Sequence, residues 1–249
     1  MPQLYDQIGR GYHVQRRPDP RIAAMILRAL NGARSVVNVG AGAGSYEPID
    51  RPVVAVEPSP VMLRQRPPGS APTLQGSATA LPFRDGAFDA ALAVLTVHHW
   101  PERARGLAEL RRVARDRAVI LTWVPDAARF WLIDDYFPAL GESDRALFDP
   151  LETLGRILGP LDVSPVPIPH DCVDGFLGAY WRRPEAYLDP AVRRAMSTFN
   201  RIGDTEAGVA RLRSDLADGT WRRRHGALLT REALDLGYRL VIARGLGAT

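Results

Sequence analysis

The most constraining feature of the sequence is a glycine-rich turn that directly follows a short β-branched run. Residues 34–39 read RSVVNV, and Gly40, Gly42 and Gly44 follow at alternate positions. A β-branched run that ends in glycine predicts a buried strand. Glycines at this spacing let the backbone turn sharply and approach a ligand, and a helix beginning after them offers free N–H groups. Taken alone, the turn fits either a dinucleotide loop or an ordinary strand-to-helix connection.

A carboxylate downstream of the turn sharpens the interpretation. Glu57 ends a second predicted strand, residues 51–57, and lies 17 residues after Gly40. A carboxylate at this position can accept hydrogen bonds from both hydroxyls of a ribose. A solvated glutamate at a strand end is the plainer alternative, but the order of strand, glycine turn, helix, strand and acid favours the ribose. The NAD fingerprint requires Gly or Ala where this chain has Ser45, so the turn does not demand a dinucleotide.

The rest of the chain alternates between strands and helices. Asp19 and Pro20 predict the start of a helix that precedes the first strand. Further strands are predicted at 73–76, 88–97, 117–124, 161–170 and 238–243, with helices at 101–115 and 151–158. This alternation predicts an α/β fold with a doubly wound, mostly parallel sheet of seven strands and helices on both faces.

The connection between the last two predicted strands is much longer than a simple link requires. It contains Pro184 and Pro190, each of which marks the start of a helix. We therefore expect residues 1–170 and 222–249 to form the α/β core, and residues 171–221 to form a helical insertion that caps the ligand site.

Composition limits the classes of protein that remain. The chain has 249 residues, of which 46% are hydrophobic, enough for one sizeable core. All 32 basic residues are arginine, and they are scattered among acids, as the codon usage of a GC-rich genome produces. The densest cluster, residues 222–224, is too short for a nucleic-acid-binding tail, so nucleic acid is a disfavoured partner.

Other sequence features concern the compartment. Cys172 is the only cysteine, which agrees with a reducing, cytoplasmic location. No apolar run has the length that a membrane crossing requires, and the first residues lack the apolar segment of a secretory signal, so no membrane partner is expected.

The segment GSATALPFRDGAFDAALAVLTVHHW, residues 76–100, adds a specific resemblance. Together with the glycine turn and Glu57, it resembles the small-molecule branch of the class I S-adenosylmethionine-dependent methyltransferases. This branch includes the ubiquinone and menaquinone C-methyltransferases. The similarity extends from about Leu4 to Trp123. It implies a Rossmann-like fold, S-adenosylmethionine as the cofactor, and methyl transfer to a small organic acceptor.

The resemblance also implies which residues bind the cofactor. In the family the glycine turn lies along the methionine part, and the acid after the second strand holds the ribose hydroxyls. The residues after that acid pack on adenine, the fourth strand ends beside the sulfonium, and an N-terminal tyrosine segment folds over the cofactor. The matching residues here are Tyr5, Tyr12, Gly40, Ala41, Gly42, Gly44, Glu57, Pro58, Met62, Ser77, Ala78, Val94 and Leu95.

Two positions depart from the family pattern. Asn38 stands where the glycine motif usually opens with Asp or Glu, and Ser77 stands where an Asp usually lies near the adenine amine. Both replacements stay polar but lose a negative charge. They leave open a non-catalytic module that binds S-adenosylmethionine or a nucleotide. An RNA methyltransferase also stays open, although no appended RNA-binding domain is visible.

Methyl transfer from a sulfonium is an in-line displacement in which the protein mainly positions the nucleophile and excludes water. A base is needed only when the nucleophile arrives protonated. His98 and His99 match family positions beside the reaction centre and are candidate bases, although hydrogen bonding to the local loop explains them equally. The remaining histidines are dispersed, so no metal site is expected.

Aromatic residues follow the fifth and sixth predicted strands, at the sheet edge where this fold binds ligands. Candidate acceptor-binding residues are Trp123, Phe130, Trp131, Tyr180, Trp181 and Arg182. Together they indicate an aromatic or prenyl-like acceptor that carries an anionic group, although packing within a cap explains each aromatic alone. An NAD(P)-dependent oxidoreductase is a further alternative, disfavoured by Ser45 and by the lack of lysine. Nothing in the sequence indicates the oligomeric state.

Overall fold

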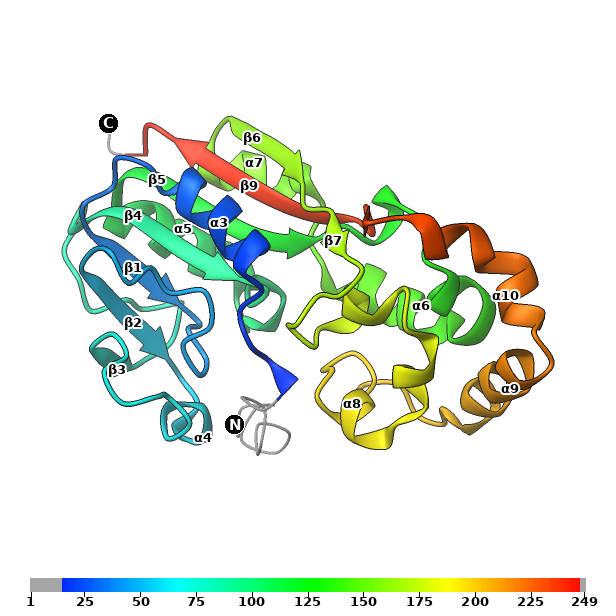
Figure 1. Ribbon diagram of the computed structural model, residues 1–249. Helices are drawn as coiled ribbons and strands as arrows, with labels where there is room; N and C mark the ends of the chain where they lie inside the picture. Colours follow the sequence, from blue (N-terminus) through cyan, green and yellow to red (C-terminus); the bar gives the residue numbers. More distant parts are fainter. Residues whose placement is uncertain (1–14, 247–249) are drawn as a thin grey trace.

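The computed structural model of the chain describes residues 15–246. Its centre is a seven-stranded sheet with the order β3-β2-β1-β4-β5-β9-β6 (Figure 1). The first five strands in the chain are parallel, and β9 runs antiparallel to both of its neighbours, β5 and β6. The prediction of a mostly parallel seven-stranded sheet is therefore confirmed. The strands are β1 Val36–Val39, β2 Val53–Glu57, β3 Thr73–Gln75, β4 Phe88–Val94, β5 Ala114–Trp123, β6 Leu161–Pro165 and β9 Tyr238–Arg244.

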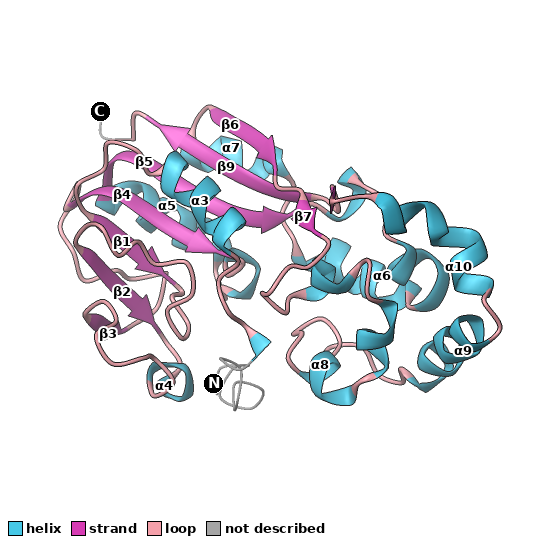
Figure 2. Ribbon diagram, in the orientation of Figure 1, coloured by secondary structure: helices cyan, strands magenta, loops and turns pink. Residues whose placement is uncertain are grey.

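Helices cover both faces of the sheet (Figure 2). Helix α3, Pro20–Ala29, packs through Ile22 and Ile26 in the cluster on one face, which includes Val36 and Leu92. The opposite face packs in a second cluster with α5, Arg103–Val113, and α7, Leu151–Leu158. Because the central strands are buried on both faces, they read as nearly continuous apolar runs.

No helix forms in the connection between β1 and β2, contrary to the sequence prediction. Residues 40–52 form turns and bends only. After three glycines, Pro48 and Pro52 leave too short a stretch for a helix. Arg51 closes the connection by donating from Nη1 to Leu30 O at 2.8 Å and Ala33 O at 2.9 Å, beyond the last turn of α3. The glycine turn therefore lacks the helix N-terminus that the sequence led us to expect.

Two predicted strands end early. The strand predicted at 88–97 stops at Val94, because Leu95 adopts a left-handed φ of 49° and a 3-10 turn, η1 Val97–His99, follows. The strand predicted at 161–170 is divided at its prolines. Its second part, β7 Ile168–Pro169, pairs with β8 Ala233–Leu234 in a separate two-stranded sheet.

A helical lobe lies beyond the carboxyl end of β5 (Figure 1). We call it the cap and define it as residues 125–148 and 170–232. The first segment contains η2 Pro125–Ala127, the π-helix η3 Leu132–Tyr136, and α6 Pro138–Leu147. The second contains η4 Leu177–Tyr180, η5 Pro184–Leu188, α8 Pro190–Arg194, α9 Glu206–Ala217, α10 Thr220–His225 and η6 Gly226–Thr230. The domain boundaries at residues 170 and 222 stay a prediction.

Edge-to-face aromatic contacts join the two cap segments. The Trp131 ring lies 5.8 Å from that of Tyr136, 5.7 Å from Tyr187 and 5.3 Å from Trp221, all near perpendicular. Aromatic rings favour this arrangement, and such pairs contribute beyond the area that they bury. These rings form the aromatic core of the cap, which is continuous with the cluster that α3 and the sheet share.

A buried polar network connects the cap to the sheet. The Asp174 carboxylate, fully buried, accepts from Arg16 Nε at 2.5 Å and from Tyr46 Oη at 2.9 Å. Tyr46 Oη in turn accepts from Asp19 N at 3.2 Å. The Asp19 side chain begins α3 by accepting from Arg21 N at 3.0 Å, and it also accepts from Val173 N at 3.3 Å. Segments far apart in the sequence thus meet at one cluster of satisfied polar groups.

No helix within residues 15–246 combines the length and the apolar composition that a membrane crossing requires.

We predict that Asp19→Ala lowers the free energy of unfolding by about 2 kcal/mol, the upper end of the range for a lost helix cap, because Val173 N also loses its acceptor. Asp19→Asn should cost less, because its amide oxygen still caps the helix. Asp189→Ala, at the exposed cap of α8, is the matched control and should cost about 1 kcal/mol. Urea denaturation measures all three, and equal losses at the two caps would contradict this account.

The same site predicts a pH dependence. Burial opposes ionisation of Asp19, but hydrogen bonds from Arg21 and Val173 outweigh it and lower the pKa of the carboxyl. Its stabilising effect is therefore present above the unfolded-state pKa, about 3.9, and is lost as the pH falls through the lower folded-state value.

Candidate functional site

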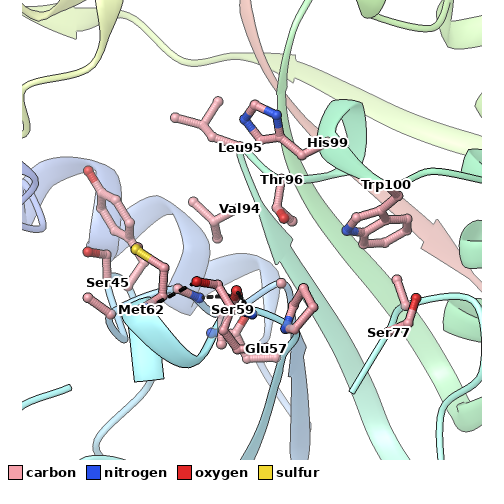
Figure 3. Close-up of a pocket in the computed structure, with 18 of the residues that line it drawn as sticks. Ser45, Glu57, Ser59, Met62, Ser77, Val94, Leu95, Thr96, His99 and Trp100 are labelled. Carbon is pink, nitrogen blue, oxygen red and sulfur yellow. Dashed lines mark hydrogen bonds between the residues drawn. The ribbon is translucent and has the colours of Figure 1, made fainter. Parts of the chain in front are cut away.

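The main cavity, about 920 Å³, opens at the carboxyl ends of β1, β2 and β4 (Figure 3). We call it the first cavity. Among the predicted cofactor residues that the structure describes, all except Gly44 line it: Gly40, Ala41, Gly42, Glu57, Pro58, Met62, Ser77, Ala78, Val94 and Leu95. Predicted residues Tyr5 and Tyr12 lie outside the described residues. Open α/β sheets bind ligands at this edge, where the strand order reverses.

The glycine turn is shaped by close contacts with the neighbouring strands. Gly40 has a φ of +71°, and its N–H donates to Val56 O at 2.8 Å. A Cβ added to Gly40 would lie 2.1 Å from Thr96 Oγ1, so no larger residue fits. Gly42 has a φ of +55° and donates its N–H to Glu57 Oε2 at 2.8 Å. The sequence therefore requires glycine here for both conformation and space.

Glu57 is held in one orientation by backbone donors. Besides the bond from Gly42, its Oε1 accepts from Ser59 N at 2.9 Å, and the residue is 5% exposed. Ser59 itself begins the short helix α4, Pro60–Leu63, by accepting from Met62 N at 3.3 Å. These backbone bonds orient the carboxylate in the cavity wall, at the end of β2 where this type of fold binds ribose. Figure 3 shows the carboxylate beside Met62 and Ser59 in the cavity wall.

The structure explains why Asn38 replaces the usual acid. Asn38 Nδ2 donates to Glu47 Oε1 at 3.1 Å, and Arg66 Nη2 bonds both oxygens of Glu47, at 2.9 and 2.7 Å. The Glu47 and Arg66 side chains are almost fully buried beneath the glycine turn. An aspartate at position 38 would set a second carboxylate against Glu47, whereas the amide supplies a donor. The neutral residue is therefore matched to the buried Glu47–Arg66 pair.

The other departure, Ser77, lies at the opposite end of the cavity. Its Oγ lies 2.9 Å from Thr79 Oγ1 and accepts from Thr79 N at 3.3 Å, which fixes the turn after β3. Trp100 faces the same end (Figure 3). Its buried Nε1 has no hydrogen-bond partner among the described residues. This end therefore offers an N–H donor and a hydroxyl where the family has a carboxylate.

Two residues other than glycine adopt left-handed backbone in the cavity wall. Tyr46 has a φ of 64° and Leu95 a φ of 49°. Such conformations cost about 1–3 kcal/mol each and gather at functional sites. Leu95 is held there by donating its N–H to Leu121 O at 2.8 Å. The strain turns the chain away from β4 at the rim of the cavity.

A second cavity of about 450 Å³ adjoins the first and shares Arg16, Leu95 and His99 with it. Its wall comes from the sheet edge and from both cap segments, and it combines aromatic, aliphatic and polar side chains. The residues that line it and not the first cavity are His98, Trp123, Asp144, Phe148, Phe176, Leu177, Met196, Ser197, Thr198 and Tyr238. A lining of this composition suits a small organic molecule.

The structure places most of the predicted acceptor residues outside the second cavity. Trp123 lines the second cavity, but Trp131 and Trp181 pack inside the cap, where Trp131 Nε1 donates to Trp181 O and Trp181 Nε1 to Ile168 O, both at 2.9 Å. Phe130 lines a separate cavity at the outer side of the cap. These rings lie outside the second cavity because they are buried in the aromatic core of the cap.

Tyr180 and Arg182 also lie outside both cavities. The Tyr180 ring packs under the Arg183 guanidinium at 4.8 Å, and Arg183 Nη2 bonds Cys172 O and Ala179 O at 2.6 and 2.9 Å. Arg182 Nη1 donates to Arg231 O at 3.1 Å on the surface. The anion-binding rim expected from these arginines is therefore absent from the second cavity.

Several residues of the second cavity were missed by the sequence reasoning, and one of them carried a signal. Leu140, Asp144 and Phe148 recur at every fourth position, which places all three on one side of α6 and its end. A charged residue on an apolar stripe is uncommon. Asp144 was therefore detectable as an exception in the helical pattern.

Both candidate bases are electrically neutral at physiological pH. Burial, reinforced by His99 and by Arg201, lowers the pKa of His98 well below its ordinary value. Burial and nearby arginines lower the pKa of His99 to about 3. The His98 ring stacks on Phe148 with a centroid distance of 4.1 Å. Groups with such low pKa values hold a proton poorly, which disfavours the predicted role as general bases. Within the described part of the chain, no three His, Cys, Asp or Glu side chains group as metal ligands.

Comparisons with known proteins agree with this geometry. A family described as a methyltransferase domain matches residues 37–122. A crystal structure from Anabaena variabilis, described as a methyltransferase from an antibiotic biosynthesis pathway, is 34% identical. The match covers 92% of this chain and 98% of that one, with a TM-score of 0.84. No curated protein matches the sequence.

More distant structures share the fold alone. The YcgJ protein of Bacillus subtilis is 14% identical over 88% of this chain and 95% of that one, with a TM-score of 0.53. The [4+2]-cyclase SpnF is 17% identical over 90% of this chain and 80% of that one, with a TM-score of 0.50. One of these relatives is named for a cyclisation, so fold similarity at this level does not define a reaction.

We predict that Gly40→Ala loses more stability than Gly69→Ala. Both positions have a left-handed φ, but nothing lies within 4 Å of a Cβ added at Gly69. Gly69→Ala therefore reports the backbone cost alone, about 1–2 kcal/mol. Gly40→Ala adds the clash with Thr96 and should also weaken binding of S-adenosylhomocysteine. Urea denaturation measures the free energy of unfolding, and calorimetry measures the affinity for S-adenosylhomocysteine. Equal destabilisation by the two substitutions would show that a Cβ at position 40 does not clash with Thr96.

We predict that Glu57→Ala weakens S-adenosylhomocysteine binding by about 1–3 kcal/mol, because charge-assisted hydrogen bonds are lost. The free energy of unfolding should fall as well, because the N–H groups of Gly42 and Ser59 lose their acceptor. Isothermal calorimetry measures the affinity, with the exposed Glu152→Ala in α7 as control. Binding as tight as that of the parent would remove Glu57 from the cofactor site.

Proposed function

Because this chain belongs to the class I S-adenosylmethionine-dependent methyltransferases, we propose that it methylates a small aromatic acceptor bound in the second cavity. One observation carries the proposal: the cavity that suits the cofactor adjoins a second cavity with aromatic residues in its wall, and the two share Leu95 and His99. A methyl donor in the first cavity and an acceptor in the second would meet at these residues.

The residues of the first cavity suit the cofactor at each end. Glu57 presents fixed carboxylate oxygens to a ribose, and Gly40 and Gly42 let the backbone approach the amino-acid part. Met62 packs from α4, and Trp100 Nε1 is a buried donor at the end near Ser77. When bound, S-adenosylmethionine supplies a methyl group on a positively charged sulfur.

The side chains at the junction would position the acceptor and exclude water. Leu95 and the neutral His99 face both cavities, and among the described residues Arg16 is the one cation that lines both. Arg16 is compensated by its buried partner Asp174. In-line displacement depends mainly on alignment of the reacting atoms, which the side chains that line both cavities would provide.

The proposed acceptor is aromatic and small. The rings of Trp123, Phe148, Phe176 and Tyr238 line the second cavity, and aromatic walls favour a flat aromatic ligand. The resemblance to ubiquinone and menaquinone C-methyltransferases favours the same class. The Anabaena relative is described as part of an antibiotic biosynthesis pathway, which favours a secondary metabolite. The anionic group suggested by Arg182 is not part of the proposal, since that side chain lies on the surface.

The remaining alternatives are weaker. An RNA acceptor requires an extended basic surface, whereas Arg16 is the one arginine among the described residues that line the second cavity. The buried Cys172, which has no cysteine partner in the chain, supports a reducing compartment such as the cytoplasm.

We predict that saturating S-adenosylhomocysteine raises the melting temperature and that NAD leaves it unchanged, because only a ligand bound by the native state stabilises the fold. Methyl transfer is measured with isotope-labelled S-adenosylmethionine against a panel of small aromatic molecules, with mass spectrometry of the products. A rise with NAD alone would contradict the cofactor. Labelling of RNA in place of small molecules would contradict the acceptor class.

A further inference from the structure

The second cavity contains a buried carboxylate with an unused oxygen. Asp144 is 1% exposed, and its Oδ1 accepts from Arg201 Nη2 at 2.6 Å. Its Oδ2 has no hydrogen-bond partner among the described residues. A buried carboxylate oxygen without a donor is costly, and native structures rarely keep one without a function. Since Asp144 lines the second cavity, a ligand there can supply the missing donor.

Arg201 and the Thr198 hydroxyl approach the Asp144 carboxylate and hold it in place, and neither of them donates to Oδ2. His98 faces the cavity from η1, Tyr238 from β9, and Arg16 from the segment before α3. Tyr238 Oη accepts from Gly178 N at 3.1 Å, and burial raises the pKa of the Tyr238 hydroxyl, which therefore stays protonated and neutral. Arg201 approaches from the cap on the Oδ1 side. The ion pair therefore fixes Asp144 by one oxygen and leaves the other for the cavity.

Electrostatics make Asp144 the better proton acceptor in this cavity. Burial raises its pKa to about 6, against the opposing effect of Arg201. His98 and His99 have pKa values far lower, as described above. A general base works best when its pKa lies near the working pH. Asp144 meets this condition and the histidines do not.

We propose that Asp144 Oδ2 binds an aromatic hydroxyl of the acceptor and takes its proton during methyl transfer. This inference rests on the proposed function, because it assigns the acceptor to the second cavity. The hydroxyl oxygen forms a bond to the methyl carbon, the carbon–sulfur bond breaks, and its electron pair stays on sulfur. The hydroxyl proton passes to Asp144 Oδ2. The acceptor class is thus a phenol, and the product is its methyl ether.

The test compares 2-naphthol with 2-methoxynaphthalene, which has the same ring system but no hydroxyl donor. Both are titrated into protein saturated with S-adenosylhomocysteine. We expect 2-naphthol to bind at least about tenfold more tightly, the effect of a hydrogen bond to a charged group. With labelled S-adenosylmethionine, 2-naphthol should be converted to its methyl ether.

The variant Asp144→Asn tests the residue. Arg201 holds the amide oxygen, so the amide N–H₂ replaces Oδ2 and turns an acceptor into a donor. The ratio of the affinities for 2-naphthol and 2-methoxynaphthalene should fall to near one. The rate of ether formation should drop at least about a hundredfold, within the range for a lost general base. The control Asp126→Asn changes an exposed carboxylate of the same cap segment. It should keep both the preference for 2-naphthol and the rate of ether formation. Unchanged binding of S-adenosylhomocysteine shows that each variant is folded.

The parent protein provides an independent measurement. The preference for 2-naphthol should decline as the pH falls through about 6, because protonated Asp144 no longer accepts as a carboxylate. Equal binding of the two probes, binding of neither, or a preference that survives Asp144→Asn overturns the proposal. If S-adenosylhomocysteine itself does not bind, the proposed function fails. If it binds and other acceptors are methylated, only the role of Asp144 fails.

Discussion

The site depends on one buried ion pair, Arg16 with Asp174. A buried carboxylate is stable only when its charge is compensated and its oxygens are hydrogen-bonded, and here Arg16 and Tyr46 meet both requirements. Arg16 lines both cavities, and Tyr46 lines the first. The residue after Asp174, Gly175, donates its N–H to Gln15 O at 2.8 Å. The interaction that attaches the cap to the segment before α3 therefore also positions residues in the walls of the two cavities.

Much of the sheet and of the cofactor side could be predicted from the sequence because both depend on local patterns. A β-branched run ending in glycine gave β1, and a carboxylate at the end of the next run gave Glu57. The residues that line the first cavity follow the ends of neighbouring parallel strands, so their order in the sequence determines their place at one edge. The prediction of a helix after the turn was wrong. The glycine motif specifies the turn itself, whereas the prolines that follow it leave too short a stretch for a helix.

The acceptor side could not be predicted in the same way. Its wall combines the end of β5, the end of α6, the start of η4 and the segment after α8, and no local pattern specifies that these meet. Aromatic residues such as Trp131 and Trp181 were assigned to the ligand, but burial against each other is equally favourable for them and occurs in the cap. Asp144 is the exception, because a charged residue among apolar residues at helical spacing can be recognised from the sequence alone.

The chain has many arginines and no lysine, and this affects the electrostatic potential at its surface. Arg112 bonds Phe83 O at 2.7 Å and Leu81 O at 3.0 Å while it pairs with Glu109 and Asp85. Arg51 similarly holds two carbonyls beyond α3 and also pairs with Asp50. A planar guanidinium presents five donors, so it joins several acceptors at once, which the point charge of an ammonium matches poorly. These guanidinium groups connect loops of the protein by bonding its own carbonyl and carboxylate oxygens. The net positive charge counted from the sequence therefore overstates how strongly the surface would attract a polyanion.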